Sequence, residues 1–111
     1  MSARPEPVDT VFAALADPAR RRAVELLQES PRRAGELAAL LDLPAPAMSR
    51  HLKMLKQSGL VDETHPVEDA RVRIYALRTE RLQELKSWLA RAEQGWSRQL
   101  ASFRDRVETP E

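Results

Sequence analysis

The stretch that decides the fold of this chain reads Ala45-Pro46-Ala47-Met48-Ser49-Arg50-His51-Leu52-Lys53-Met54-Leu55-Lys56. Its apolar residues recur at steps of four and three, the spacing of one helix face: Met48, Leu52 and Leu55. The other side carries serine, arginine and lysine, and residues 45–61 contain three cations and no acid. We therefore predict a helix over about residues 45–57. Its polar face suits the major groove of DNA; the alternative is an ordinary solvated face with a few cations.

A shorter helix is predicted immediately upstream, over about residues 34–41, and Pro44 separates the two helices. Its apolar residues are expected to face inward: Leu37, Ala38, Leu40 and Leu41. Two helices joined by so short a break have the spacing of a helix-turn-helix. Gly59 follows the second helix, at a place where a glycine cap is common.

Two further helices are predicted nearer the N-terminus. The first covers about residues 8–16, with Phe12 and Leu15 as its expected buried side chains. Asp17 and Pro18 then supply an N-cap followed by proline at the first helical position. The second helix ends near residue 28, and its apolar stripe consists of Ala23, Val24, Leu26 and Leu27.

Further along the chain, the hydrophobic pattern changes to a period of two. Residues 60–65 and 71–77 are predicted to be the strands of a hairpin, which forms a wing over about residues 61–77. Arg71 and Arg73 are expected to share one face of the second strand, where they can contact a DNA backbone or a minor groove. The alternative is that both arginines are solubilising charge on an edge strand.

A long helix is predicted from about residue 79 to about residue 107. Its apolar residues recur at steps of three and four over about 40 Å of helix, at about 1.5 Å per residue. A domain of this size cannot cover all of them, and leaving them in water is unfavourable. We therefore predict dimerisation through this helix and the first helix; a hydrophobic ligand pocket at the interface is the alternative. The predicted interface residues are Phe12, Leu85, Trp88, Leu89, Ala92, Trp96, Leu100 and Phe103.

Composition fits one soluble, globular domain. The chain has 111 residues, 42% hydrophobic and 32% charged, with a formal net charge of +1. It has no cysteine, which excludes disulfides and thiolate metal sites. No signal peptide or membrane-spanning run is recognisable, so a cytoplasmic protein is expected. We predict a single domain over residues 8–107, with disordered tails at residues 1–7 and 108–111.

The predicted fold class is α+β, mostly α: a winged helix-turn-helix with a long C-terminal dimerisation helix. An enzyme is not expected. Ser49 and His51 are two residues apart on a helix, so their side chains diverge by about 200° and cannot serve as nucleophile and base. The sequence also has no glycine-rich phosphate loop and no paired-carboxylate motif.

Four blocks of the sequence match a known family in order and spacing. They are Phe12-x-x-Leu15-x-Asp17-Pro18-x-Arg20-Arg21, Ala34-Gly35-Glu36-Leu37-Ala38, Met48-Ser49-Arg50-His51-Leu52-Lys53-x-Leu55 and Gly59-Leu60-Val61. With these blocks the chain closely resembles the ArsR family of bacterial winged helix-turn-helix repressors over about residues 8–90. The resemblance implies a homodimer that binds double-stranded operator DNA with dyad symmetry and represses its own or neighbouring genes.

The sequence departs from the metal-sensing pattern of that family. Members that sense metals through a cysteine pair carry it in the helix before the recognition helix, where residues 37–43 offer no ligand here. The predicted terminal helix contains no histidine, the ligand that other members use there. A metal site of His65 with Glu63, Glu68 or Asp69 is weighed against a solvated hairpin, and the hairpin is favoured. We expect a metal-independent regulator without a cofactor, and its effector is left open.

The recognition helix also departs from the family at its start, where Pro44 and Ala45 replace a common serine and glutamine. Base reading is therefore expected from Ser49, Arg50 and His51. The predicted phosphate or wing contacts are Ala47, Lys53, Lys56, Arg71 and Arg73.

A run of three arginines, Arg20 to Arg22, also fits the family pattern. One of them can reach a phosphate, whereas pairing of the others with Asp17 or Glu25 is expected. The alternative to a repressor is a dimeric interaction module, such as an antitoxin, that uses the tryptophan-rich terminal helix.

Overall fold

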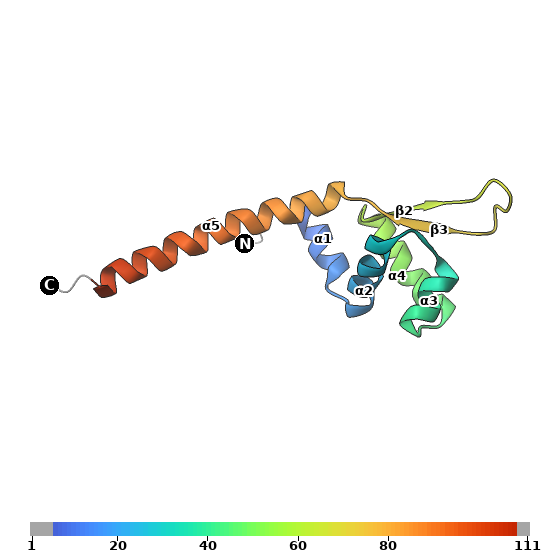
Figure 1. Cartoon of the computed structure of the whole chain (residues 1–111), viewed down its shortest axis with the longest axis horizontal. Coiled ribbons are helices and arrows are strands. Elements are labelled where there is room, and N and C mark those ends of the chain that lie inside the picture. Colours follow the sequence, from blue (N-terminus) through green and yellow to red (C-terminus); the bar gives the residue numbers. More distant parts are fainter. Residues whose placement is uncertain (1–5, 109–111) are drawn as a thin grey trace.

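The computed structural model describes residues 6–108 and contains five helices and three strands within them (Figure 1). The helices are α1 (Pro7–Leu15), α2 (Pro18–Glu29), α3 (Ala34–Leu41), α4 (Ala45–Gln57) and α5 (Glu80–Glu108); the strands are β1 (Arg32–Arg33), β2 (Val61–Thr64) and β3 (Ile74–Leu77). α2, α3, α4 and the sheet gather at one end, and α5 extends far beyond them. The molecule therefore measures 75 × 29 × 25 Å. This arrangement confirms a mostly helical winged helix-turn-helix with a long C-terminal helix.

The N-terminal helices begin at residues that can cap them. The Asp17 carboxylate accepts a hydrogen bond from the Ala19 N–H at 2.7 Å, which confirms the predicted N-cap of α2. At α1, Asp9 Oδ2 accepts from the Glu6 N–H at 2.6 Å. The predicted tail at residues 1–7 is therefore wrong for its last two residues, and residues 1–5 lie outside the described part. Glu108 is likewise helical, whereas residues 109–111 are not described.

The two helices of the helix-turn-helix have the predicted bounds. α3 ends where Asp42 takes a left-handed conformation, with φ of 55°, and the Leu43 N–H donates to the Ala38 carbonyl at 2.9 Å. α4 ends in the same way at Gly59, with φ of +80°, and the Leu60 N–H donates to the Leu55 carbonyl at 3.0 Å. The positive φ favours glycine at position 59, and a Cβ there would also lie 2.9 Å from Arg81 Nε of α5, so that the Arg81 side chain would have to shift.

The core is formed by side chains of the helices α1 to α4 and of the sheet. Two of the predicted buried residues are exposed. Met48, Leu52 and Leu55 are fully buried, as expected. Phe12, however, is 38% exposed, because α1 turns Val8, Val11 and Ala14 inward; its ring packs edge-on against Trp88 at 5.0 Å. Leu40 is 53% exposed, because the inward face of α3 is occupied by Leu37 and Ala38.

The two strands of the wing, β2 and β3, are shorter than predicted, and β1 adds a third strand to the sheet. The order is β1-β3-β2, all antiparallel, with Arg33 opposite Ile74. The prediction that Arg71 and Arg73 lie on a strand is wrong, since β3 begins at Ile74. The Asp69 carboxylate accepts from the Arg71 N–H at 3.0 Å, so Arg71 lies in a turn before the strand.

No helix within residues 6–108 is both long enough and apolar enough to cross a membrane.

Candidate nucleic-acid interface

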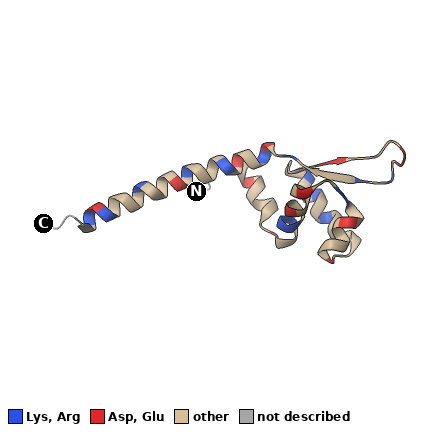
Figure 2. Cartoon of the chain, in the orientation of Figure 1, with Lys and Arg blue, Asp and Glu red and all other residues tan. Residues whose placement is uncertain are grey.

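The outer face of α4 carries two exposed cations. Burial of Met48, Leu52 and Leu55 fixes the rotation of the helix, so that Arg50 and Lys53 point away from the core and are exposed. Neither cation forms an ion pair with any of residues 6–108. Figure 2 shows that Lys and Arg positions, in blue, occur along α4. This face therefore has positive charge available for a phosphate or for a base edge.

Ser49 and Ala47, also predicted to contact DNA, are both half-buried on α4. Each lies one residue away from the fully buried Met48, which turns it by about 100°. Both residues therefore lie on the shoulders of the helix, by which we mean its two sides between the buried stripe and the exposed face.

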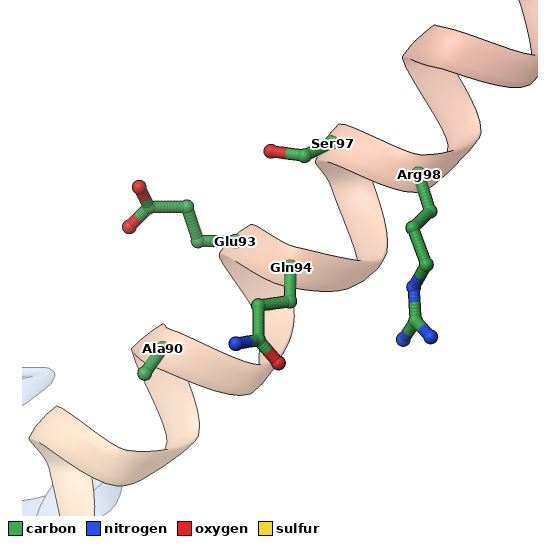
Figure 3. Close-up of a pocket in the computed structure, with 5 residues that line it drawn as sticks. All are labelled: Ala90, Glu93, Gln94, Ser97 and Arg98. Carbon is green, nitrogen blue, oxygen red and sulfur yellow. The ribbon is translucent and has the colours of Figure 1, made fainter.

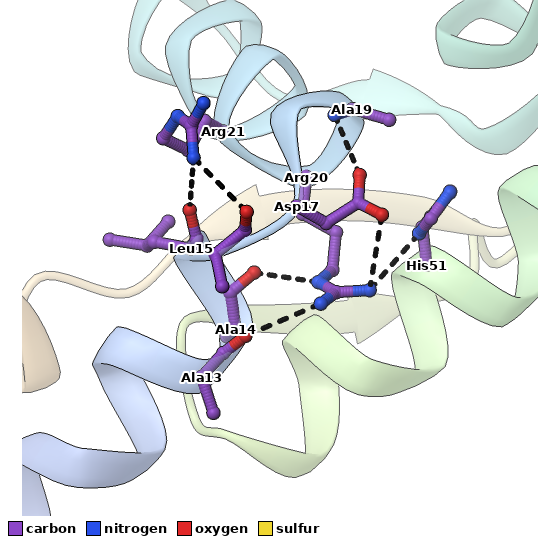
Figure 4. Close-up of polar contacts among 9 residues, drawn as sticks. Ala13, Ala14, Leu15, Asp17, Ala19, Arg20, Arg21 and His51 are labelled. Carbon is purple, nitrogen blue, oxygen red and sulfur yellow. Dashed lines mark hydrogen bonds and ion pairs between the residues drawn. The ribbon is translucent and has the colours of Figure 1, made fainter.

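His51 lies on a shoulder of α4 and is turned toward α2 (Figure 4). Its Nδ1 is 3.3 Å from a terminal nitrogen of Arg20, and the residue is half-buried. The Arg20 guanidinium also donates through Nε to the Ala14 carbonyl at 2.6 Å and lies 4.0 Å from the Asp17 carboxylate. One guanidinium thus joins the end of α1, the start of α2 and the recognition helix.

The same contacts decide the roles of the arginine run. Arg21 donates to the Leu15 carbonyl at 2.8 Å and to the Ala16 carbonyl at 3.3 Å, so it closes the end of α1 as Arg20 does (Figure 4). The Ala19 N–H lowers the pKa of Asp17 below its ordinary value, and His51 and Arg20 lower it further. The expected pairing with Asp17 is made by Arg20, whereas Arg22 is exposed on α2.

Glu63 joins α4 to the base of the wing. Its carboxylate lies 3.1 Å from Lys56 Nζ and 3.4 Å from His65 Nε2, and its side chain is only 15% exposed. The hydrogen bond from Lys56 lowers the pKa of Glu63 below its ordinary value of 4.5. The predicted phosphate contact Lys56 therefore already shares its ammonium group with the wing. Within the described residues, no group of histidines and carboxylates is arranged to hold a metal ion.

The wing arginines lie together with an arginine that sequence reasoning did not select. Arg33, Arg71 and Arg73 line one hollow of about 340 Å³ beside the start of α3. Arg71 is almost fully exposed and pairs weakly with Asp69 at 3.4 Å. Arg33 reaches this surface because β1 pairs with β3, and a two-residue strand has no periodicity by which the sequence could reveal it.

The distal half of α5 exposes a line of large apolar side chains. Trp96 is 70% exposed, and Leu100, Phe103 and Val107 are each more than 60% exposed. Of the other predicted interface residues, Leu89 is exposed, and three are half-buried: Leu85, Trp88 and Ala92. A hollow of about 500 Å³ along this helix is lined by Ala90, Glu93, Gln94, Ser97 and Arg98. Figure 3 shows that all five project from the single helix, so the hollow is an open flank rather than an enclosed ligand site.

Comparisons with known proteins agree with this architecture. The family described as "Bacterial regulatory protein, arsR family" matches residues 17–63. The transcriptional repressor SdpR of Bacillus subtilis (strain 168) is 30% identical over 82 residues, which cover 74% of this chain and 88% of that protein. The HTH-type transcriptional regulator Rv2034 of Mycobacterium tuberculosis is 38% identical over 101 residues, covering 91% and 89%.

Solved structures show the same likeness. An ArsR-like transcriptional regulator from Rhodococcus sp. RHA1 has a TM-score of 0.79 and 28% identity, and the match covers 95% of this chain and 94% of that one. An ArsR family transcriptional regulator, RHA00566, has a TM-score of 0.75 and 32% identity, covering 87% and 97%.

The Glu63 contacts predict how acid affects stability. Because the pKa of Glu63 is lower in the folded chain than its ordinary value of 4.5, its contribution to stability is complete above that value and is lost as the pH falls through the folded pKa. We expect the unfolding free energy of a Glu63→Gln variant to decrease less on acidification than that of the wild type, measured by urea denaturation from pH 6 to pH 3. Glu68→Gln, at the exposed wing tip, is the control; an identical acid response of Glu63→Gln and wild type would contradict the prediction.

Proposed function

Because this chain belongs to the ArsR family of bacterial regulatory proteins and is a DNA-binding transcriptional regulator, we propose that it is a homodimeric repressor of a short inverted-repeat operator. The observation that carries the proposal is the exposed face of α4 with Arg50 and Lys53, which form no ion pair within residues 6–108 and are turned outward by three fully buried residues on the opposite side. A helix presented in this way fits a major groove. We place the protein in the bacterial cytoplasm, where its operator lies, and assign it no catalytic activity, cofactor or metal.

In the proposed complex, α4 reads bases while the flanking elements bind the backbone. Arg50 is the central base contact, since its exposed guanidinium has no ion-pair partner among residues 6–108 and suits the O6 and N7 acceptors of guanine. Ser49 and His51 flank it on the two shoulders of the helix. Lys53 and the wing arginines supply phosphate contacts, with Ala47 close to the backbone. Lys56 is also proposed to contact phosphate, but it must then exchange its ion pair with Glu63.

The second part of the proposal is a dimer through α1 and α5. Phe12 and Trp88 already pack against each other, and they continue into the exposed apolar line of α5. A monomer would leave that line in water, which is unfavourable for side chains of this size. A second copy of the chain covers the line and presents a second α4, which an operator with dyad symmetry requires.

The exposed aromatic side chains of α5 also support a second candidate, a dimeric interaction module such as an antitoxin. Selection of genomic DNA fragments by the purified protein at physiological salt separates the two. A repressor is expected to recover one short inverted-repeat motif, and footprinting then places it at a promoter. Recovery of fragments without a common motif would favour the interaction module.

Arg50→Ala tests base reading directly. We expect affinity for the selected duplex to fall about tenfold or more, because a bidentate arginine–guanine contact contributes about 1–3 kcal/mol of discrimination. Affinity for a scrambled duplex of equal length is expected to change much less. Mobility-shift titrations measure both, and Arg91→Ala on exposed α5 is the control. Equal losses on both duplexes would make Arg50 a phosphate contact instead.

Trp96→Glu tests the dimer. A carboxylate placed on the apolar line would have to be buried without a partner in the interface, so the dimer dissociation constant is expected to rise about tenfold or more. Sedimentation equilibrium measures the constant. The control Gln94→Glu adds the same charge to another side of α5, the open flank shown in Figure 3. If both variants dimerise equally well, the apolar line does not form the interface.

A further inference from the structure

The contact between Arg20 and His51 specifies where the histidine ring carries its proton. A guanidinium has only N–H donors and no acceptor. At 3.3 Å from Arg20, His51 Nδ1 must therefore be the acceptor, and it holds a lone pair rather than a hydrogen. In the neutral ring the proton then lies on Nε2. Figure 4 shows that this second nitrogen points away from Arg20.

Arg20 is held firmly enough to impose this choice. Its side chain is 14% exposed, and three groups outside α4 fix its guanidinium: the Ala14 carbonyl at 2.6 Å, the Ala13 carbonyl at 3.3 Å and the Asp17 carboxylate at 4.0 Å. The guanidinium cannot turn away from His51 without breaking these contacts. The ring therefore meets a fixed donor whose position does not depend on DNA.

We propose that Arg20 is a positioning residue that keeps His51 in the Nε2–H tautomer, so that α4 presents a hydrogen-bond donor to an acceptor of the operator. This inference rests on the proposed function, in which α4 faces DNA. The opposite tautomer would present a lone pair on Nε2, which phosphate oxygens and the O6, O4 and N7 atoms of bases cannot satisfy. Arg20 thus restricts His51 Nε2 to partner atoms that accept a hydrogen bond, and Arg20 does not contact DNA itself.

The chain supplies a matched control for this role. Arg21 makes the same kind of contact with the end of α1, through the Leu15 and Ala16 carbonyls, but it has no hydrogen bond to His51. Arg20→Met and Arg21→Met each remove guanidinium–carbonyl bonds at the end of α1, whereas only Arg20→Met frees the ring.

The first measurement is the tautomer of His51 in the free protein, from long-range ¹H–¹⁵N correlation spectra of the neutral ring. We expect the Nε2–H tautomer alone in the wild type and in Arg21→Met, and a mixture of both tautomers in Arg20→Met. Arg20→Lys, whose ammonium also only donates, is expected to restore the single tautomer. A wild-type ring with its proton on Nδ1, or an unchanged tautomer in Arg20→Met, would overturn the proposal.

The second measurement is binding to the inverted-repeat duplex recovered by the selection. Arg20→Met is expected to lose about tenfold in affinity, which corresponds to the net contribution of about one hydrogen bond. The dependence of log affinity on log salt concentration is expected to keep the same slope. In a His51→Phe background the same substitution is expected to have little further effect, because the two residues act as one unit. An equal loss in both backgrounds, or a slope lower by about one, would show that Arg20 acts independently of His51. If the wild type selects no duplex, the repressor function fails, whereas the spectra still decide the role of Arg20.

Discussion

The burial of one apolar stripe on α4 is the constraint on which the rest of the molecule depends. Met48, Leu52 and Leu55 are fully enclosed by the surrounding helices and the sheet, so α4 can neither rotate nor slide. A helix with one buried stripe has to turn its remaining side chains outward or sideways. Arg50 and Lys53 are exposed for this reason. The side chains on the two sides of this exposed face, His51 and Lys56, contact residues of other elements.

Those shoulders connect α4 to two different parts of the protein. On one shoulder His51 meets Arg20, which is fixed at the junction of α1 and α2. On the other shoulder Lys56 meets Glu63 at the base of the wing. Each connection consists of a charged group that is largely shielded from water, where electrostatic contacts are stronger than on an open surface. The polar side chains beside the free face therefore have defined positions before any DNA arrives.

The sequence predicts the elements whose bounds depend on local signals. It does not predict the elements whose formation depends on pairing between residues far apart in the chain. The bounds of α3 and α4 follow from proline, glycine and the apolar spacing, and the Asp17 cap follows from its place before Pro18. β1 could not be found, because its two residues are held only by β3. Arg71 was misplaced because the turn at Asp69 overrides the alternating pattern. For the candidate site, the sequence identifies the residues of α4 but not their partners, since Arg20 and Glu63 reach them only in the folded chain.

The tight fit at Gly59 has a mechanical consequence. The vacant side-chain position there is filled by Arg81 from the first turn of α5, so the last turn of α4 and the beginning of the long helix interlock. Just before α5, the Arg78 N–H donates to the Leu60 carbonyl at 2.8 Å, which is a second contact between the end of α4 and the start of α5. The place where α5 leaves the domain is therefore set by contacts with the end of α4, so a substitution at Gly59 or Arg81 would act on both helices at once.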